Sequence, residues 1–301
     1  MPPYAPEDRV TVSLSYQANQ ATSADGTRIG FRTLGSGPGL VLLHGSMQWS
    51  GSHLGLAGLL ADQFTVHLPD RRGRGLSGPY PAPADFGVRT ELADLAAVVE
   101  ATGTRDLFGV SASGLIVLEA ARAMPGIRRV AVYEPALALA GEDLSSWLPR
   151  YDREIAEGRV AAALVTAMMG LRLGPPAFFP RGVMTLLTKA ILRSQDKKAA
   201  EGEPTMRTLA PTLGYEGRLV RELTGALDRY ASLTNDVLLL GGGKGLPWIK
   251  PGLDALEATI PHGTRVEFAG LDHGGTADAG PAGPAGKPAV VAPELRRFFS
   301  A

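Results

Sequence analysis

The clearest chemical signal in the sequence is a serine at a sharp corner of the chain. Residues 107–115 read as an apolar strand that turns at Ser111 and continues as a helix. Such a corner brings helix backbone against strand backbone, so it requires small side chains around the serine. Small residues occupy those places: Gly109, Ala112, Ser113 and Gly114. A hydroxyl at a helix N-terminus suits a nucleophile, because developing negative charge is favoured there; the alternative is a serine that only caps the helix.

A histidine that could act as general base lies near the end of the sequence. His273 follows an apolar run, residues 265–268, that predicts a strand. The carboxyl ends of parallel strands meet at one edge of a sheet, so this arrangement would place His273 beside Ser111. The remaining histidines outside the loop of residues 41–47 are weaker candidates, because they fall in a helix, within a strand and at the opposite sheet edge: His53, His67 and His262.

Acyl transfer also needs two N–H donors preset around a developing oxyanion. The run 41–47 ends an apolar strand with His44, Gly45 and Ser46, and a glycine-containing loop of this kind can present one donor. We assign this role to the backbone N–H groups of Ser46 and Ala112. His44 is interpreted as a structural support of the loop and not as the base.

The elements that must position these residues follow an alternation of short apolar runs and longer helical periods. This alternation predicts an α/β fold with a mostly parallel central sheet flanked by helices. The expected strands are residues 27–34, 40–44, 64–68, 106–110, 129–133, 237–240 and 265–268. The expected helices around them are residues 53–62, 88–103, 112–124, 252–259 and 290–299.

The alternation stops after Pro135, and about a hundred residues with helical spacing follow. Candidate helices in this insertion are residues 144–157, 160–170, 183–195 and 218–233. Breaks are expected at Pro175 and Pro176 and over residues 197–204. A later stretch, residues 274–287, is too rich in glycine and proline to form an element and predicts a mobile loop.

Four of these features occur in the order typical of the α/β-hydrolase fold family, which the chain resembles over almost its whole length. They are the loop at His44, the turn at residues 70–77, the corner at Ser111 and the late His273. The resemblance implies that the turn at residues 70–77 is structural. The sequence departs from the family pattern at Ser113, where the family usually has glycine.

The resemblance also implies a division of the chain into a body and a cap. The α/β-hydrolase core would comprise residues 1–136 and 235–301, and residues 137–234 would form a helical cap over the active site. Several large apolar residues of this cap could line a substrate pocket, although most such residues at helical spacing pack into a core. They are Trp147, Met168, Met169, Phe178, Phe179 and Met184.

The acid that the family usually places after the strand ending at Leu240 is missing, since residues 241–248 contain no Asp or Glu. A neutral imidazole acts as base only when a carboxylate holds its other nitrogen and stabilises the imidazolium. We assign this role to Glu134, because some family members, haloalkane dehalogenases among them, place their acid at the end of that strand. The alternative is a structural carboxylate at the cap junction. Other acids are less well placed: Asp236, Asp254, Asp272 and Asp278.

The composition limits the classes of function. Thirty Lys and Arg balance thirty Asp and Glu, so no overall charge attracts nucleic acid or an anionic membrane surface. The absence of cysteine excludes thiol nucleophiles and thiolate metal sites, and no cofactor or metal is implied. The apolar stretch 160–171 is shorter than the roughly 20 residues that cross a bilayer. Residues 1–10 lack the pattern of a secretory signal, so we expect a cytoplasmic protein without a membrane partner.

Together these features predict a serine hydrolase that cleaves a carboxylic ester, a lactone or a thioester of a mainly apolar small molecule. Ser111 would attack the carbonyl to form an acyl-serine, His273 would move the proton, and Glu134 would steady the imidazolium. Two other functions stay open. One is a ligand-binding or sensor protein with little turnover, which the missing acid and Ser113 favour; the other is a natural-product tailoring enzyme that does not act on esters.

Overall fold

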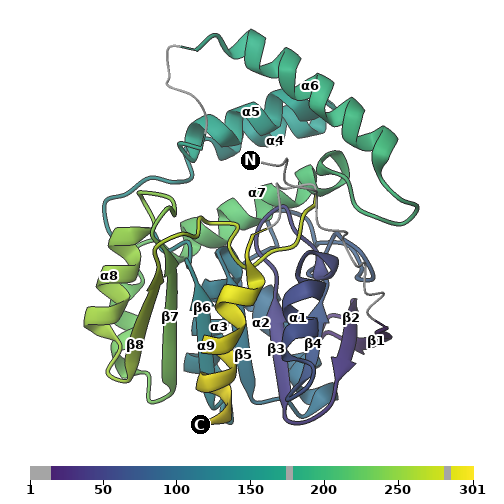
Figure 1. Cartoon of the computed structure of the whole chain (residues 1–301). Helices are drawn as coiled ribbons and strands as arrows, with labels where there is room; N and C mark the ends of the chain where they lie inside the picture. The colour runs from purple at the N-terminus through teal and green to yellow at the C-terminus, as the bar shows by residue number, and fades with distance from the viewer. Residues whose placement is uncertain (1–14, 174–178, 281–285) are drawn as a thin grey trace, which may run out of the picture.

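The computed structural model describes residues 15–173, 179–280 and 286–301, and a single mixed sheet organises them (Figure 1). Its eight strands have the order β1-β2-β4-β3-β5-β6-β7-β8. β2 pairs antiparallel with both β1 and β4, and all other neighbours are parallel. The strands are β1 (Gln17–Thr22), β2 (Arg28–Gly35), β3 (Gly39–Leu43), β4 (Thr65–Pro69), β5 (Asp106–Val110), β6 (Arg129–Tyr133), β7 (Asp236–Gly242) and β8 (Gly263–Phe268).

Helices cover both faces of the sheet, because its central strands are apolar on both sides. In β5, Leu107 packs into a cluster with α2 (Val88–Thr102), α3 (Ala112–Ala123) and α8 (Lys250–Thr259). Its neighbour Phe108 points to the other face, towards α1 (Leu54–Leu60) and α9 (Pro288–Ser300). This alternation is expected of a strand buried on both faces. The predicted α/β class with a mostly parallel sheet is confirmed.

Most of the helical segment, described over residues 137–173 and 179–234, lies above the carboxyl ends of the parallel strands (Figure 1). It contains α4 (Leu148–Ala156), α5 (Val160–Gly170), α6 (Arg181–Lys198) and α7 (Met206–Leu223). The segment has small apolar cores of its own: Trp147 and Tyr151 pack with Leu213, and Leu164 packs with Leu192 and Ala210. Its helices therefore pack against one another as well as over the sheet.

Two elements differ from the sequence predictions. The expected helix 218–233 is wrong in its bounds: α7 begins twelve residues earlier, at Met206, and ends at Leu223, and a short 3-10 helix, Leu227–Ser232, follows it. Gly225 separates them with a φ of 73°, a left-handed conformation that ends a helix. β1 was not predicted, because it is a mostly exposed edge strand of polar residues in which only Ala21 is buried. The predicted break at Pro175 and Pro176 and part of the predicted loop 274–287 lie outside the described residues.

Candidate active site

Ser111 stands between β5 and α3 in a backbone conformation that few residues adopt. Its φ is 56°, in the left-handed region, where a residue with a side chain is strained. The turn is held because the Ser111 N–H donates to the Tyr133 carbonyl of β6 at 2.9 Å. It also needs the small residue at position 109, since a Cβ there would lie 2.5 Å from the carbonyl oxygen of Ser113. Strand, turn and helix thus lift the Ser111 hydroxyl to the end of the sheet.

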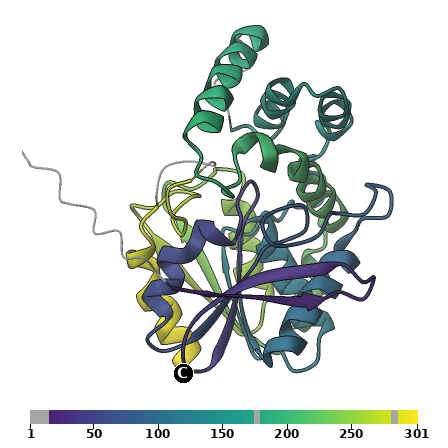
Figure 2. The same ribbon diagram turned by 90° about the vertical axis from the view of Figure 1, so that its right-hand side faces the viewer.

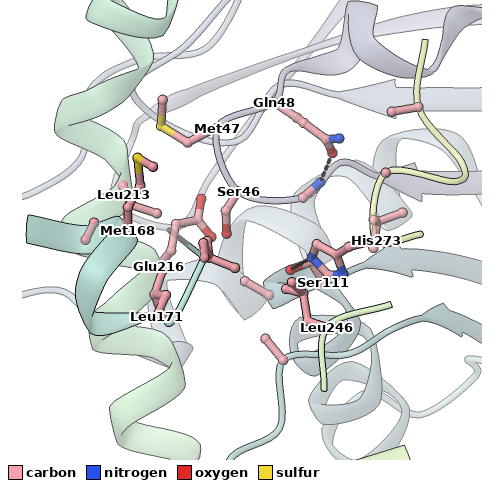
Figure 3. Close-up of a pocket in the computed structure, with 18 of the residues that line it drawn as sticks. Ser46, Met47, Gln48, Ser111, Met168, Leu171, Leu213, Glu216, Leu246 and His273 are labelled. Carbon is pink, nitrogen blue, oxygen red and sulfur yellow. Dashed lines mark hydrogen bonds between the residues drawn. The ribbon is translucent and has the colours of Figure 1, made fainter. Parts of the chain in front are cut away.

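The structure brings Ser111, His273 and Glu134 into one hydrogen-bonded row, which we call the serine row. The Ser111 hydroxyl oxygen lies 3.1 Å from Nε2 of His273, and Figure 3 shows the two side chains facing each other. Nδ1 of His273 lies 2.6 Å from Oε2 of Glu134. A carboxylate only accepts hydrogen bonds, so Nδ1 carries a hydrogen and its N–H donates a hydrogen bond to Glu134. Nε2 then presents its lone pair to the serine hydroxyl, as a general base requires.

Glu134 reaches His273 from the end of β6, and the glycine-rich loop after β7 makes room for it. Its side chain is 2% exposed, and its φ of 44° is again in the left-handed region. Oε1 accepts the N–H of Gly242 at 2.9 Å. A Cβ on Gly245 would lie only 1.9 Å from the same oxygen. The loop after β7, which has no acid of its own, therefore leaves space for the carboxylate of Glu134 from the end of β6.

The other candidate acids have different partners among the described residues. Asp236 is exposed at the start of β7, and Asp254 pairs with Arg265. The carboxylate of Asp272 accepts the N–H of Gly274. Asp278 accepts the N–H of Gly55 at 2.7 Å, an anchoring contact that the sequence did not indicate. Glu134 is accordingly the carboxylate that the structure places against the His273 ring.

The predicted oxyanion donors, Ser46 and Ala112, both line the cavity beside Ser111 (Figure 3 labels Ser46 and Ser111). Within the described part of the chain, neither backbone N–H donates a hydrogen bond. Two hydrogen bonds fix the loop that carries Ser46. The Ser113 hydroxyl donates to the His44 carbonyl oxygen at 2.6 Å, and the Gly45 N–H donates to Oε1 of Gln48 at 2.8 Å. The hydroxyl at position 113, the departure from the family pattern, thus ties the corner to this loop.

A cavity of about 680 Å³ connects the serine row to the helical segment. Its wall is mainly apolar and comes from both parts, with Leu144, Trp147, Leu164, Met168, Leu171 and Leu213 on the helical side. Of the apolar residues singled out in the sequence, Trp147 and Met168 line the cavity. Met184 is buried, Met169 and Phe179 are exposed, and Phe178 lies outside the described residues.

Comparison with known proteins agrees with this geometry. The profile of the alpha/beta hydrolase family matches residues 40–285. This chain belongs to that family. It is 30% identical over 252 residues to a pimeloyl-[acyl-carrier protein] methyl ester esterase of Stenotrophomonas maltophilia, which covers 78% of this chain and 89% of that protein. Both the predicted family and the predicted fold are confirmed.

Comparison with solved structures also shows the alpha/beta hydrolase fold. An alpha/beta hydrolase from Sphaerobacter thermophilus superposes with a TM-score of 0.72 at 32% identity, over 93% of this chain and all (100%) of that one. An esterase from Rhodococcus sp. has the same fold, with a TM-score of 0.64 at 23% identity, over 94% of this chain and 98% of that chain.

Two buried histidines of this hydrolase support the site. His44 lies with Nδ1 2.9 Å from the Gly45 carbonyl oxygen, and its Nε2 accepts the Arg71 N–H at 3.2 Å. Burial, aided by Arg74 and Arg71, holds the pKa of His44 well below its usual range, so the ring is neutral. His53 lies 3.1 Å from the Thr276 carbonyl oxygen and 3.1 Å from Gln48 Oε1. Burial lowers the pKa of His53 to about 4.

A second charged group of the hydrolase, which we call the arginine cluster, joins the helical segment to the core. Arg71 pairs with Glu91 at 2.5 Å and with Glu216 of α7 at 2.7 Å, and Arg74 pairs with Glu216 at 2.9 Å. Burial would raise the pKa of Glu216, but Arg71 and Arg74 outweigh it and lower the pKa. Glu216 lines the cavity and was missed in the sequence, because a lone acid in a helix carries no sign of its distant partners.

The turn that carries these arginines is held at its first residue. Asp70 pairs with Arg32 at 2.9 Å and accepts the N–H groups of Ser50 and Leu76. These contacts are consistent with the structural role that the resemblance implied for the turn.

Neither a metal centre nor a membrane span is found in the described part of the hydrolase. Residues 15–173, 179–280 and 286–301 contain no cluster of three or more His, Cys, Asp or Glu side chains able to hold a metal ion. Within the same residues, no helix combines the length and hydropathy needed to cross a bilayer.

Proposed function

We propose that this alpha/beta hydrolase cleaves carboxylic esters of mainly apolar small molecules through an acyl-serine intermediate. The observation that carries the proposal is the serine row, with 3.1 Å from Ser111 to His273 and 2.6 Å from His273 to Glu134. Relatives named as esterases support the choice of an ester. A lactone or a thioester presents the same carbonyl to the serine.

The reaction begins when Nε2 of His273 takes the Ser111 proton while the serine oxygen attacks the ester carbonyl carbon. Negative charge develops on the carbonyl oxygen, where the backbone N–H groups of Ser46 and Ala112 would bind it. Glu134 stabilises the imidazolium through its hydrogen bond to Nδ1. As the tetrahedral intermediate collapses, the carbon–oxygen bond to the alcohol breaks and His273 returns the proton to the leaving alcohol. In the second half of the reaction, His273 takes a proton from water while the water oxygen attacks the acyl carbon. The bond from that carbon to the Ser111 oxygen then breaks, His273 returns the proton to Ser111, and the carboxylic acid leaves.

The cavity favours a neutral, apolar substrate. Its wall offers few polar groups, and the carboxylate of Glu216 is already neutralised by Arg71 and Arg74. We propose that residues 137–234 act as a cap that supplies this wall, over a core of residues 1–136 and 235–301. The relatives from Stenotrophomonas are named for a pimeloyl-[acyl-carrier protein] methyl ester, and an extended acyl chain of this kind is one substrate class for the cavity. The cytoplasmic location expected from the sequence stays a prediction.

The sensor alternative loses one of the two features that favoured it, since Glu134 lies beside His273 in the place of the acid that the loop after β7 lacks. A fluorophosphonate probe tests the proposal, because it reacts with an activated serine. It should label the wild-type chain and not Ser111→Ala, and p-nitrophenyl esters of increasing chain length should be hydrolysed. Equal labelling of both chains, or the absence of turnover across the ester series, would overturn the proposal.

A further inference from the structure

Exposed apolar side chains gather on one part of the molecule. Of the ten large hydrophobic side chains that are exposed among the described residues, seven fall between positions 169 and 191. They are Met169, Leu173, Phe179, Val183, Leu186, Leu187 and Ile191. Leu186 and Leu187 are 68% and 55% exposed. Single exposed apolar residues are ordinary, but a contiguous group of this kind marks an interaction surface.

Most of this group is a face of α6, the helix that lies farthest from the sheet (Figures 1 and 2). Val183, Leu187 and Ile191 are spaced four residues apart, so they lie along one side of the helix. The adjoining side of the helix already packs on the helical segment through Met184, Thr188 and Leu192. The exposed face is therefore additional to the side that holds α6 in the fold.

Positive charge accompanies this face. Lys189, Arg193, Lys197 and Lys198 of α6 are exposed, and none forms an ion pair with another described residue. The acidic residue of the helix, Asp196, pairs with Arg207. The balanced charge of the whole chain thus hides a local excess of cations beside the apolar residues. A helix with an apolar face and basic flanks matches an interface between hydrocarbon and anionic headgroups.

The apolar face continues into the catalytic cavity. Leu173 and Ile191 are 44% and 51% exposed, and both line the cavity that reaches Ser111. A second copy of the chain seated here would cover this opening and bring two sets of unpaired cations together. A lipid surface would instead leave an apolar path from the hydrocarbon to the cavity.

We propose that α6 docks the hydrolase onto lipid surfaces that carry anionic headgroups, and that apolar substrate enters the cavity from that surface. Leu186, Leu187 and their neighbours insert among the acyl chains, while the lysines and Arg193 contact the headgroups. This proposed peripheral contact differs from the expectation, drawn from the zero net charge, that no membrane surface takes part. The docking of α6 does not depend on ester cleavage, whereas the entry of substrate from the surface rests on the proposed function.

Vesicle sedimentation tests the proposal. Phosphatidylcholine vesicles with about one-third phosphatidylglycerol should bind the chain, and binding should fall at least about tenfold in pure phosphatidylcholine or near ~0.5 M salt. Leu186→Gln combined with Leu187→Gln should lower the partition coefficient at least about tenfold. Lys197→Gln with Lys198→Gln should lower it about fivefold for each lysine removed. Leu59→Gln, at an exposed leucine on α1 away from the cap, is the matched control and should bind like the wild type.

The outcomes separate this proposal from the proposed function. Ser111→Ala should bind vesicles as the wild type does, and the α6 variants should keep their rate on a short, water-soluble ester. Vesicle binding that is the same in the leucine variant and the wild type would overturn the proposal. So would a chain that ignores vesicles and instead self-associates, or binds only an acidic protein, through the same leucines.

Discussion

The serine row and the arginine cluster are both groups of ionisable side chains that border the cavity, yet they are built differently. In the arginine cluster, Arg71 and Arg74 face Glu91 and Glu216, so the charges balance, and each of these side chains is at most 3% exposed. The serine row contains one carboxylate and no permanent cation, and His273 is 30% exposed. Ser111 and Glu134 also hold strained backbone conformations.

This difference distinguishes a group that stabilises the fold from a group that carries out the reaction. The arginine cluster links α7 to the turn of residues 70–77 through the ion pairs of Glu216, and removal of one partner would leave an uncompensated buried charge. The serine row lacks a cation until the imidazolium of His273 forms during the reaction. The hydrogen bond between Glu134 and His273 is therefore strongest when His273 is charged. Substitutions in the two groups should therefore be felt in different measurements.

The largest effect is expected in the serine row. Glu134→Gln keeps the size of the side chain but removes the charge that stabilises the imidazolium, so turnover of an ester should fall by about 10⁴ while the melting temperature stays near that of the wild type. Steady-state kinetics and thermal unfolding measure both quantities. Asp272→Asn is the control, because among the described residues this neighbouring carboxylate accepts the Gly274 N–H and does not contact the His273 ring, so the rate should change little. A near-normal rate in Glu134→Gln would refute the assignment.

A loss of stability is expected when the arginine cluster is broken. Glu216→Ala leaves Arg71 and Arg74 without one of their anions in a buried place, which should lower the free energy of unfolding by about 3–5 kcal/mol. Denaturant titration measures it. Asp196→Ala breaks the more exposed pair with Arg207 and should cost less than about 1 kcal/mol. Equal losses in the two variants would show that burial and pairing of Glu216 do not hold the helical segment.

The smallest effect concerns pH and contrasts two imidazoles of the site, since His53 is fully buried whereas His273 is partly exposed. The folded-state pKa of His53 is about 4, below the unfolded value near ~6.5, so the unfolded chain binds more protons between these limits. His53 should therefore reduce stability as pH falls through that window, by up to ~1.4 kcal/mol per pH unit. Unfolding free energies should have a shallower slope there in His53→Gln. If the free energy of unfolding of His53→Gln had the same pH dependence as that of the wild type, the lowered pKa of His53 would be contradicted.

The sequence predicted the members of the serine row because each follows a recognisable apolar strand or strand-turn-helix pattern. Ser111 and His273 stand directly or shortly after such runs, and parallel strands carry their carboxyl ends to one edge. Glu134 could be selected because the loop after β7 lacks an acid, and because the resemblance implied that some family members place their acid at the end of the strand that is β6 here.

Other features could not be predicted, since they depend on contacts between distant segments. Nothing in the helical period around Glu216 points to Arg71, which is 145 residues away. The polar strand β1 has no hydrophobic alternation, because it pairs only at the sheet edge. The apolar face of α6 has the same composition as a core-facing side, so the sequence alone could not tell which side stays exposed.

The reach of Glu134 across from β6 has a consequence for protein engineering. Gly242 donates a hydrogen bond to the carboxylate, and Gly245 lies too close to it to carry a side chain. Lys244, Leu246 and Trp248 of the same loop line the cavity. In a hydrolase that keeps its acid on this loop, remodelling the wall would disturb proton transfer. Here the acid is on β6 and these three positions follow β7, so substitutions at them can change the shape of the cavity without removing a member of the serine row.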